Sequence, residues 1–244
     1  HGVGIGAPMA VAATIPRKED WYPLWDMVGD LAAHDPSIAQ EDGKWWVFHT
    51  GEGLQVKYSS DGYTWTQGEP VFKEPLSWWK QYAPKMNYND VWAPDIQKFK
   101  DKWLLYYSVS EFGKNTSAIG LASSTSIAGG DWRDEGLVIS SGLLTGYNAI
   151  DPNLFLDKEG NPWLVFGSWF SGIQVVPLNV DTMKPVDAEA VKTIARRRIQ
   201  GQAAGIEGPI ITYKDGYYYL FVSIDHCCVN IRSDYKIAVG RSRN

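Results

Sequence analysis

A unit of 56 to 60 residues recurs along this chain of 244 residues, and this period constrains the fold more than any other feature of the sequence. Each unit contains a run of aromatic and β-branched residues, which is typical of a buried β-strand. A polar turn precedes each run, and another expected strand precedes each turn. The aromatic runs cover residues 45–50, 103–108, 163–168 and 217–223. Repetition at such a period is typical of propellers and other repeat folds.

Each unit contains further strands. A segment that alternates small and polar residues follows each aromatic run, and a segment around Trp65 or Trp132 adds a fourth strand in the first two units. The third strands cover residues 54–60, 118–124, 172–178 and 235–242. Four antiparallel strands per repeat describe a propeller blade, and no helical stretch is long enough for an α/β fold. The sequence therefore predicts an all-β propeller that forms a single domain over residues 1–244. Residues 1–28 are an N-terminal segment, and about four blades begin near residues 35, 92, 151 and 207.

Composition excludes several classes of protein. Hydrophobic residues make up 44% and charged residues 21% of the chain, which is typical of a folded soluble protein. The net charge of −5 at pH 7 argues against a nucleic-acid partner. No apolar run approaches the ~20 residues that span a bilayer, so a membrane partner is not expected. The 12 Trp and 13 Tyr residues suit strand faces, a core and sugar-stacking surfaces.

Two cysteines, Cys227 and Cys228, are adjacent in the sequence. Neighbouring side chains on a strand point to opposite faces, so we do not expect an ordinary structural disulfide. The cysteines leave the cellular compartment open. Residues 7–15 are weakly apolar and are compatible with the remains of a processed signal or with an artificial extension. Secreted and cytoplasmic locations are both compatible with the sequence, and secretion is the favoured one.

Carboxylates recur at the start of the units. They are Asp35, Asp95, Asp151 and Glu207, which stand 60, 56 and 56 residues apart and lie beside or near a proline. The first strand of every propeller blade lines the central channel, so residues near its entrance converge on one pocket. Asp before Pro is also a common turn device, but recurrence at one phase of a repeat favours a site. Asp95 follows its proline, so its phase is shifted and we expect a structural or rim role.

Four blade-start sequences resemble those of the arabinanases of glycoside hydrolase family 43. They are His34-Asp35-Pro36-Ser37, Val91-Trp92-Ala93-Pro94-Asp95, Tyr147-Asn148-Ala149-Ile150-Asp151-Pro152 and Gly205-Ile206-Glu207-Gly208-Pro209. The resemblance runs from about Gly29 to the C-terminus and is sharpest over residues 108–117 and 167–174, which separate arabinanases from xylosidases of the same family. The paired cysteines also look like an arabinanase feature. The resemblance implies a five-bladed β-propeller that cleaves internal α-1,5-L-arabinofuranosidic bonds of arabinan with inversion.

The resemblance also implies three catalytic carboxylates. Asp35 matches the general base that activates water, and Glu207 matches the general acid that protonates the leaving oxygen. Asp151 matches a third acid that orients Glu207 and favours its protonated form. Inverting hydrolysis needs one ionised and one protonated carboxyl, held roughly 6.5–9.5 Å apart so that water fits between them.

Sugar contacts of the family map onto a further set of residues. They are His34, Trp92, Phe112, Gly113, Asn148, Ala149, Ile150, Ser168, Trp169 and Phe170. Aromatic faces stack on furanose rings, and Ser, Asn and backbone groups bond hydroxyls. His34 either orients the base or is simply packed, and Trp92 is compatible with a core position. The order of Trp169 and Phe170 departs from the family pattern, so the sequence leaves open which ring faces the groove.

The family pattern includes a fifth blade with a Gly-Pro-Gly-His stretch whose histidine binds a metal ion on the propeller axis. This sequence reaches Asn244 just after the third strand of its fourth unit. We therefore expect an open ring that a C-terminal fragment or a second chain completes. The chemistry requires no cofactor. A structural calcium or another ion on the axis is expected to take its histidine from the fifth blade, so no metal ligand is expected in this chain.

Two alternatives remain open at this stage. One is an exo-acting α-L-arabinofuranosidase or β-xylosidase of the same family, because the sequence does not show how open the groove is. The other is a non-catalytic carbohydrate-binding propeller, which is expected to keep the aromatic groove and lose the acids. The three acids are present, which favours the enzyme.

Overall fold

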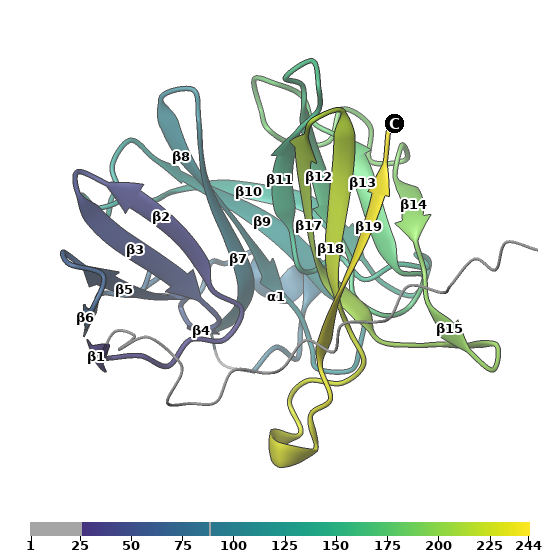
Figure 1. The fold of residues 1–244 in the computed structure, drawn as a ribbon, viewed down its shortest axis with the longest axis horizontal. Helices are drawn as coiled ribbons and strands as arrows, with labels where there is room; N and C mark the ends of the chain where they lie inside the picture. The colour runs from purple at the N-terminus through teal and green to yellow at the C-terminus, as the bar shows by residue number, and fades with distance from the viewer. Residues whose placement is uncertain (1–25, 88) are drawn as a thin grey trace, which may run out of the picture.

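The computed structural model describes residues 26–87 and 89–244, so most of the predicted N-terminal segment lies outside the described residues. Strands are the main regular secondary structure of the described part (Figure 1). The one α-helix in this part is the short α1 (Trp79–Tyr82), and residues 230–232 form a single 3-10 turn. No helix among the described residues is long and apolar enough to cross a membrane.

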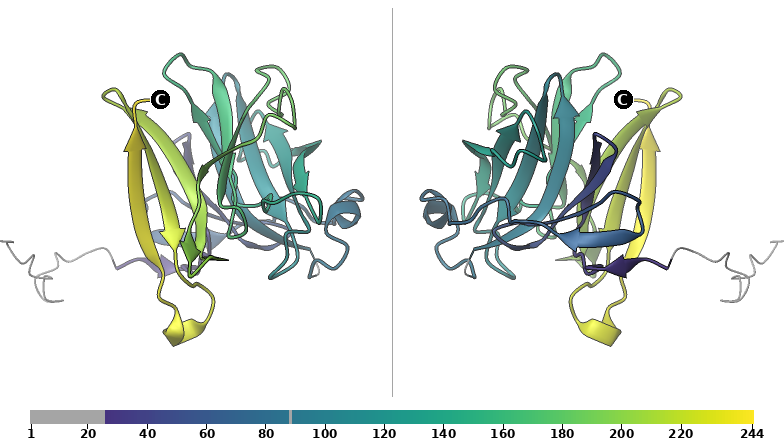
Figure 2. Two further views of the ribbon diagram at one scale, coloured as in Figure 1. Left: turned by 90° about the vertical axis from the view of Figure 1, so that its right-hand side faces the viewer. Right: turned by 90° about the vertical axis from the view of Figure 1, so that its left-hand side faces the viewer.

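Four mainly antiparallel sheets follow one another in chain order around the molecule (Figures 1 and 2). Blade 1 contains β1 (Val28–Gly29), β2 (Ser37–Glu41), β3 (Lys44–His49), β5 (Gln55–Ser59) and β6 (Thr64–Gln67). Blade 2 contains β4 (Gly51–Glu52), β7 (Asp90–Phe99), β8 (Lys102–Val109), β9 (Ser117–Ser124) and β10 (Arg133–Ser141). Within blade 1, β1 pairs with β6 in parallel, whereas the other pairs are antiparallel.

The second half of the chain forms blades 3 and 4. Blade 3 contains β11 (Asn153–Leu156), β12 (Pro162–Phe166), β13 (Ile173–Pro177) and β14 (Lys192–Ala195). A small hairpin, β15 (Arg198–Ile199) with β16 (Gln202–Ala203), then leads to blade 4. Blade 4 contains β17 (Ile206–Lys214), β18 (Tyr217–Ile224) and β19 (Lys236–Ser242). The first strand of each blade contacts the first strand of the next, which confirms the predicted all-β propeller arrangement.

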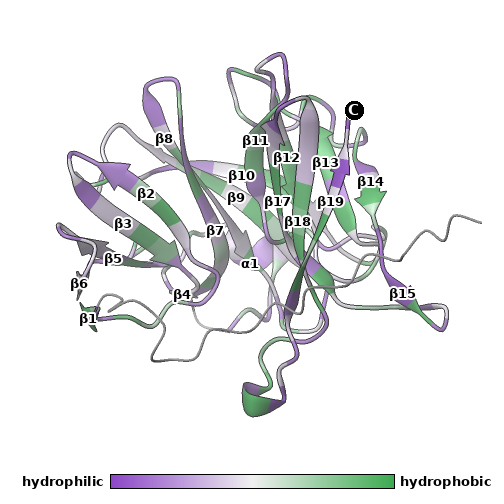
Figure 3. Ribbon diagram, in the orientation of Figure 1, coloured by the Kyte–Doolittle hydropathy of each residue, from purple (hydrophilic) through white to green (hydrophobic). Residues whose placement is uncertain are grey.

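The hydrophobic core lies between the blades, and polar residues concentrate in the turns (Figure 3). Blades 1 and 2 enclose a cluster that includes the fully buried Phe48 and Tyr107. Blades 2 and 3 enclose Tyr106 and Phe166, and a smaller cluster around Ile173 joins blades 3 and 4. Each aromatic run of the sequence therefore supplies the packing between neighbouring sheets, as a propeller requires.

The two faces of blade 4 differ in their surroundings. One face, which includes Val222, packs on blade 3. The opposite face exposes four large apolar side chains, and these are Ile210, Phe221, Ile237 and Val239. Phe221 pairs with Ile210 on one neighbouring strand and with Val239 on the other. An exposed apolar face of this kind is typical of a surface that another element covers.

Hydrogen bonds join neighbouring blades at the same point of each repeat. A side-chain oxygen on the first strand of one blade accepts a backbone N–H from the first strand of the next. The pairs are Ser37 Oγ with Ile96 at 3.0 Å, Asp95 Oδ2 with Leu154 at 2.7 Å, and Asn153 Oδ1 with Ile211 at 3.0 Å. These bonds hold the blade entrances in register, and the residues just before them are the ones that face the pocket described below.

Asp95 belongs to this set of blade contacts and does not line the pocket. The residue before the blade proline has a positive φ in every blade, with values of 50° at Asp35, 42° at Ala93, 58° at Asp151 and 59° at Gly208. The counterpart of Asp35 and Asp151 in blade 2 is therefore Ala93, and Asp95 stands two residues further along. Its carboxyl is buried, so its role is structural and it is not on the rim.

Replacing Asp95 by asparagine is expected to flatten the dependence of stability on pH. Burial raises the pKa of Asp95 to about 6, although hydrogen bonds from Leu154, Gln97 and Asn153 oppose the shift. The folded state therefore holds a proton that the unfolded state loses near pH 4, and the associated stability is lost as the pH rises from about 4 to about 6. Asparagine mimics the neutral form and keeps an acceptor for Leu154. At pH 7 we expect the variant to unfold with a free energy up to ~3 kcal/mol above that of the parent.

Urea unfolding followed by tryptophan fluorescence at pH 4, 5, 6 and 7 measures this difference. Asp157→Asn is a control of opposite sign, because hydrogen bonds from Trp163, Asn161 and Glu159 lower the pKa of Asp157 although burial raises it. If the difference in unfolding free energy between Asp95→Asn and the parent stays constant from pH 4 to pH 7, the pKa of Asp95 is not raised in the folded state.

Candidate active site

A pocket of about 710 Å³ lies where the entrances of all four blades meet. Asp35 precedes β2, Asp151 precedes β11, and Glu207 is the second residue of β17, so one carboxylate comes from each of blades 1, 3 and 4. The structure thus brings together three acids that are more than 50 residues apart in the sequence.

Nearly all of the sugar contacts predicted from the sequence line this pocket. They are His34, Trp92, Phe112, Gly113, Asn148, Ile150, Ser168, Trp169 and Phe170. Ala149 is the exception, because its side chain is fully buried in the core between blades 2 and 3. Its neighbours Asn148 and Ile150 face the pocket, so the chain alternates between pocket and core at this point.

The backbone at Asp35 and at Asp151 is strained in the same way. Both have positive φ and precede a proline, a conformation that costs on the order of 1–3 kcal/mol for a residue other than glycine. Asp tolerates it better than most residues. In blade 4 a glycine, Gly208, takes the equivalent position, so the acid of that blade is the residue before it. Ala93 has the same conformation in blade 2, so this backbone geometry belongs to the blade entrance, and it places Asp35 and Asp151 at the pocket.

Thr50 fixes one oxygen of Asp35. Its hydroxyl accepts the N–H of Ala93 at 3.0 Å and donates to Asp35 Oδ2, also at 3.0 Å. The ring of His34 lies on the same oxygen, with Nε2 3.4 Å from Oδ2. Asp35 Oδ1 has no hydrogen bond from a described residue, so this oxygen is the one available to a water molecule. His34 is 57% exposed, which excludes a simple packing role and leaves it beside the acid.

The charges of Asp35 and Glu207 both act on the carboxyl of Asp151. Its Oδ2 accepts the N–H of Gly208 at 2.9 Å, and its own N–H donates to Ser108 Oγ at 3.1 Å. Burial, followed by the negative charges of Asp35 and Glu207, raises the pKa of Asp151 well above its usual value. The charges of Asp35 and Glu207 therefore favour the protonated form of Asp151.

Both oxygens of Glu207 accept hydrogen bonds. Ser168 Oγ donates to Oε2 at 2.5 Å, and the hydroxyl of Tyr235 donates to Oε1. Ser168 follows β12 of blade 3, whereas Tyr235 directly precedes β19 of blade 4. The carboxyl of Glu207 is thus held from two blades.

Thr50 and Tyr235 are pocket residues that sequence reasoning missed. A signal existed for Thr50: a hydroxyl residue ends the aromatic strand run of each unit, and Thr50, Ser108 and Ser168 all bond a pocket acid. No comparable signal existed for Tyr235, because its approach to Glu207 depends on the conformation of the loop before β19.

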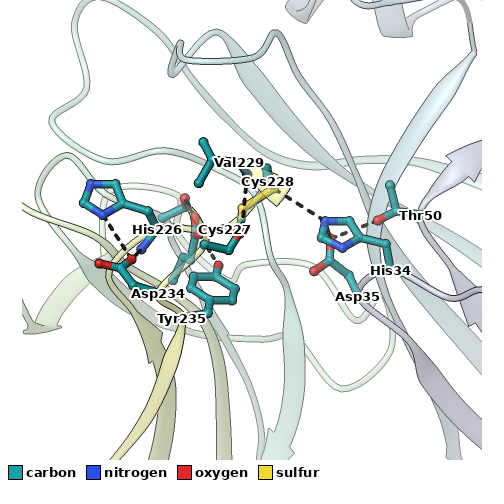
Figure 4. Close-up of a disulfide and its surroundings, with 12 residues drawn as sticks. His34, Asp35, Thr50, His226, Cys227, Cys228, Val229, Asp234 and Tyr235 are labelled. Atoms are coloured by element: carbon teal, nitrogen blue, oxygen red, sulfur yellow. Dashed lines mark hydrogen bonds and ion pairs between the residues drawn. A yellow bond between two sulfur atoms is a disulfide. The ribbon is translucent and has the colours of Figure 1, made fainter. Parts of the chain in front are cut away.

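That loop also contains Cys227 and Cys228, whose sulfur atoms bond to each other (Figure 4). The expectation that no ordinary structural disulfide forms rested on strand geometry, but these residues lie in the loop between β18 and β19, where it does not apply. Sγ of Cys228 lies 3.9 Å from Nε2 of His34, so the loop of blade 4 reaches the entrance of blade 1. Further pocket residues missed from the sequence are Asp90, Glu111, Lys114, Ala203, His226 and Val229.

Aromatic rings rim the pocket. Phe112 is 81% exposed and Phe170 is 39% exposed, whereas Trp169 is half-buried with its ring 5.5 Å from that of His226. Of the two adjacent rings, Phe170 is therefore the more accessible to a ligand. Trp92 is also half-buried and lines the pocket. Ser117 donates to Asn148 Oδ1 at 2.7 Å, which fixes this amide at the pocket wall. Exposed rings beside fixed polar groups suit a sugar.

Within the described part of the chain, no group of three or more His, Cys, Asp or Glu side chains is arranged to hold a metal ion. The residues present therefore do not by themselves fit the axial ion that the sequence resemblance implies. The steps proposed below use only the carboxyl and hydroxyl groups of this pocket.

Known proteins resemble this chain over most of its length. The sequence pattern of "Glycosyl hydrolases family 43" matches residues 19–244. The extracellular endo-alpha-(1->5)-L-arabinanase 1 of Bacillus subtilis is 53% identical over 225 residues, which are 91% of this chain and 68% of that protein. The extracellular exo-alpha-(1->5)-L-arabinofuranosidase ArbA of Cellvibrio japonicus is 38% identical over 86% of this chain and 64% of its own length. This chain thus spans about two thirds of the length of these relatives.

Solved structures show the same likeness. The endo-arabinanase of Bacillus licheniformis matches with a TM-score of 0.85 and 53% identity, over 90% of this chain and 75% of that one. An α-L-arabinanase of Cellvibrio cellulosa in complex with arabinohexaose matches with a TM-score of 0.81 and 36% identity, over 88% of this chain and 72% of that one.

Proposed function

Because the chain belongs to glycosyl hydrolases family 43, we propose that its pocket hydrolyses internal α-1,5-L-arabinofuranosidic bonds of arabinan with inversion of configuration. The observation that carries this proposal is the convergence of Asp35, Asp151 and Glu207, from three blades, on one pocket rimmed by exposed aromatic rings. A purely carbohydrate-binding propeller needs the rings but not the three acids.

Two of the acids have complementary roles in the proposed reaction. Glu207 gives its proton to the glycosidic oxygen as the bond to the anomeric carbon breaks. A water molecule attacks that carbon from the opposite face and passes its proton to Asp35, at the free Oδ1. Asp151 binds the N–H of Gly208, next to Glu207, and so holds the acid in place.

Endo action is favoured by the similarity to the Bacillus endo-arabinanases. The exo-acting relative of Cellvibrio japonicus supports exo action as the second candidate. Products from linear, debranched arabinan distinguish them. We expect a mixture of arabino-oligosaccharides early in the digest, with viscosity falling faster than reducing ends accumulate. Arabinose as the only early product contradicts endo action and supports the second candidate.

Secretion is part of the proposal. The relatives from Bacillus subtilis and Cellvibrio japonicus are both named extracellular, and the disulfide Cys227–Cys228 suits an oxidising compartment. We also infer that a fifth blade covers the exposed apolar face of blade 4, because that face presents Ile210, Phe221, Ile237 and Val239 to solvent and the relatives are longer than this chain.

A further inference from the structure

We propose that Tyr235 is a positioning residue for the general acid: its hydroxyl orients the carboxyl of Glu207 and stabilises the carboxylate that forms as the proton leaves. The inference deepens the proposed hydrolysis and rests on it. It starts from the hydrogen bond that Tyr235 donates to Glu207 Oε1.

Two hydroxyls hold the Glu207 carboxyl from opposite sides, since Ser168 donates to Oε2 and Tyr235 to Oε1. A protonated carboxyl offers one good acceptor, whereas a carboxylate offers two. The two bonds therefore gain strength as the proton moves from Glu207 to the glycosidic oxygen, because hydrogen bonds to an ionised acceptor are roughly twice as strong as neutral ones. An interaction that strengthens along the reaction lowers the barrier, whereas one of constant strength does not.

The tyrosine keeps its own proton throughout. Burial, together with the hydrogen bond to Glu207 and the charges of Glu207, Asp151 and Asp35, raises the pKa of Tyr235 far above its usual value. The hydroxyl is therefore a neutral donor at any working pH. The only proton that moves to the leaving group comes from Glu207, and the proton of the attacking water goes to Asp35.

The residues on both sides of Tyr235 contact residues at the start of the loop. Asp234 accepts the N–H of His226 at 2.8 Å and contacts the ring of His226 at 3.3 Å (Figure 4). On the other side, Lys236 Nζ lies 2.6 Å from Asp225 Oδ2. Asp225 in turn binds Arg197, before the β15–β16 hairpin, at 2.7 Å. These contacts close the loop at its base and deliver the ring of Tyr235 to Glu207, so the hydroxyl does not depend on a freely moving side chain.

A comparison of leaving groups tests the role in the full chain. Cleavage of α-1,5-arabinotriose releases a sugar through its hydroxyl oxygen, and this leaving group needs a proton from Glu207. The 2,4-dinitrophenyl glycoside of α-1,5-arabinobiose releases a phenolate, which needs none. For Tyr235→Phe we expect kcat on arabinotriose to fall roughly 10- to 100-fold, as expected for one hydrogen bond to a charged group. We expect kcat on the dinitrophenyl glycoside to change less than about 3-fold, since that reaction bypasses the acid. Both substrates are assayed on one preparation, so the ratio does not depend on the folded fraction.

Two further variants sharpen the test. Tyr213→Phe removes a hydroxyl from the exposed part of β17 in the same blade and is expected to leave both rates unchanged. In a Glu207→Gln background, Tyr235→Phe is expected to cost little more on arabinotriose, because residues that act through one group are not additive.

Equal losses on the two substrates, no loss on arabinotriose, or a full additional loss in the Glu207→Gln background each overturn the positioning role. A folded parent that cleaves neither substrate contradicts the proposed function instead, and the inference falls with it.

Discussion

Replacing Glu207 by glutamine is expected to slow hydrolysis of debranched arabinan by about 10²- to 10⁴-fold, the range of a general acid. Glutamine keeps the shape of the side chain and one acceptor for Ser168 or Tyr235, but it cannot supply a proton to the leaving oxygen. The loss should therefore appear in kcat, with little change in KM. Initial rates of reducing-sugar release measure it.

The dinitrophenyl glycoside of arabinobiose separates loss of the acid from loss of the fold. Because its leaving group needs no proton, Glu207→Gln should retain most of the parent rate on this substrate. Glu159→Gln, in the exposed turn between β11 and β12, is the matched control and should behave as the parent. If Glu207→Gln cleaves debranched arabinan at the parent rate, Glu207 is not the acid.

Replacing Asp35 by asparagine is expected to cost a similar factor, about 10²- to 10⁴-fold, but on both substrates. Asparagine can still accept the Thr50 hydroxyl, so the side chain stays in place, yet it cannot take a proton from water. A better leaving group does not help, because the missing step is the activation of the nucleophile. Rates on debranched arabinan and on the dinitrophenyl glycoside measure the two losses.

Rescue by azide is a second test of the role of Asp35. It is a nucleophile that needs no base, so it should restore turnover of the dinitrophenyl glycoside by Asp35→Asn and yield a β-arabinofuranosyl azide. An α-configured azide, or rescue by azide of Glu207→Gln instead of Asp35→Asn, contradicts the assignment of base and acid.

The repeat was enough to predict the blades and the meeting of Asp35, Asp151 and Glu207, because channel geometry brings equivalent positions together whatever the loops do. In blade 2 the position of Asp95 after its proline correctly indicated that this acid is out of phase with Asp35 and Asp151. The true equivalent of Asp35 is Ala93, and the common property is positive φ before proline, which a count of carboxylates does not show. Asp95 instead joins blade 2 to blade 3 through the N–H of Leu154.

Contacts that depend on loop conformation were beyond sequence reasoning. The placing of Tyr235 on Glu207 needs the ion pairs of Asp225 and Asp234 at the base of the loop. The bond between Cys227 and Cys228 needs a local backbone that strand rules do not describe. Ala149 was assigned to the pocket with its neighbours, whereas its side chain turns into the core beside Leu154 and Leu164.

The configuration of the first product distinguishes inverting from retaining hydrolysis directly. Debranched arabinan is mixed with the parent protein, and proton NMR follows the new reducing-end anomeric signals before mutarotation equilibrates them. Inverting hydrolysis by Glu207 and Asp35 predicts that the β-anomer appears first. If the α-anomer appears first, the reaction proceeds with retention through a carboxylate nucleophile, which contradicts the proposed roles of Glu207 and Asp35.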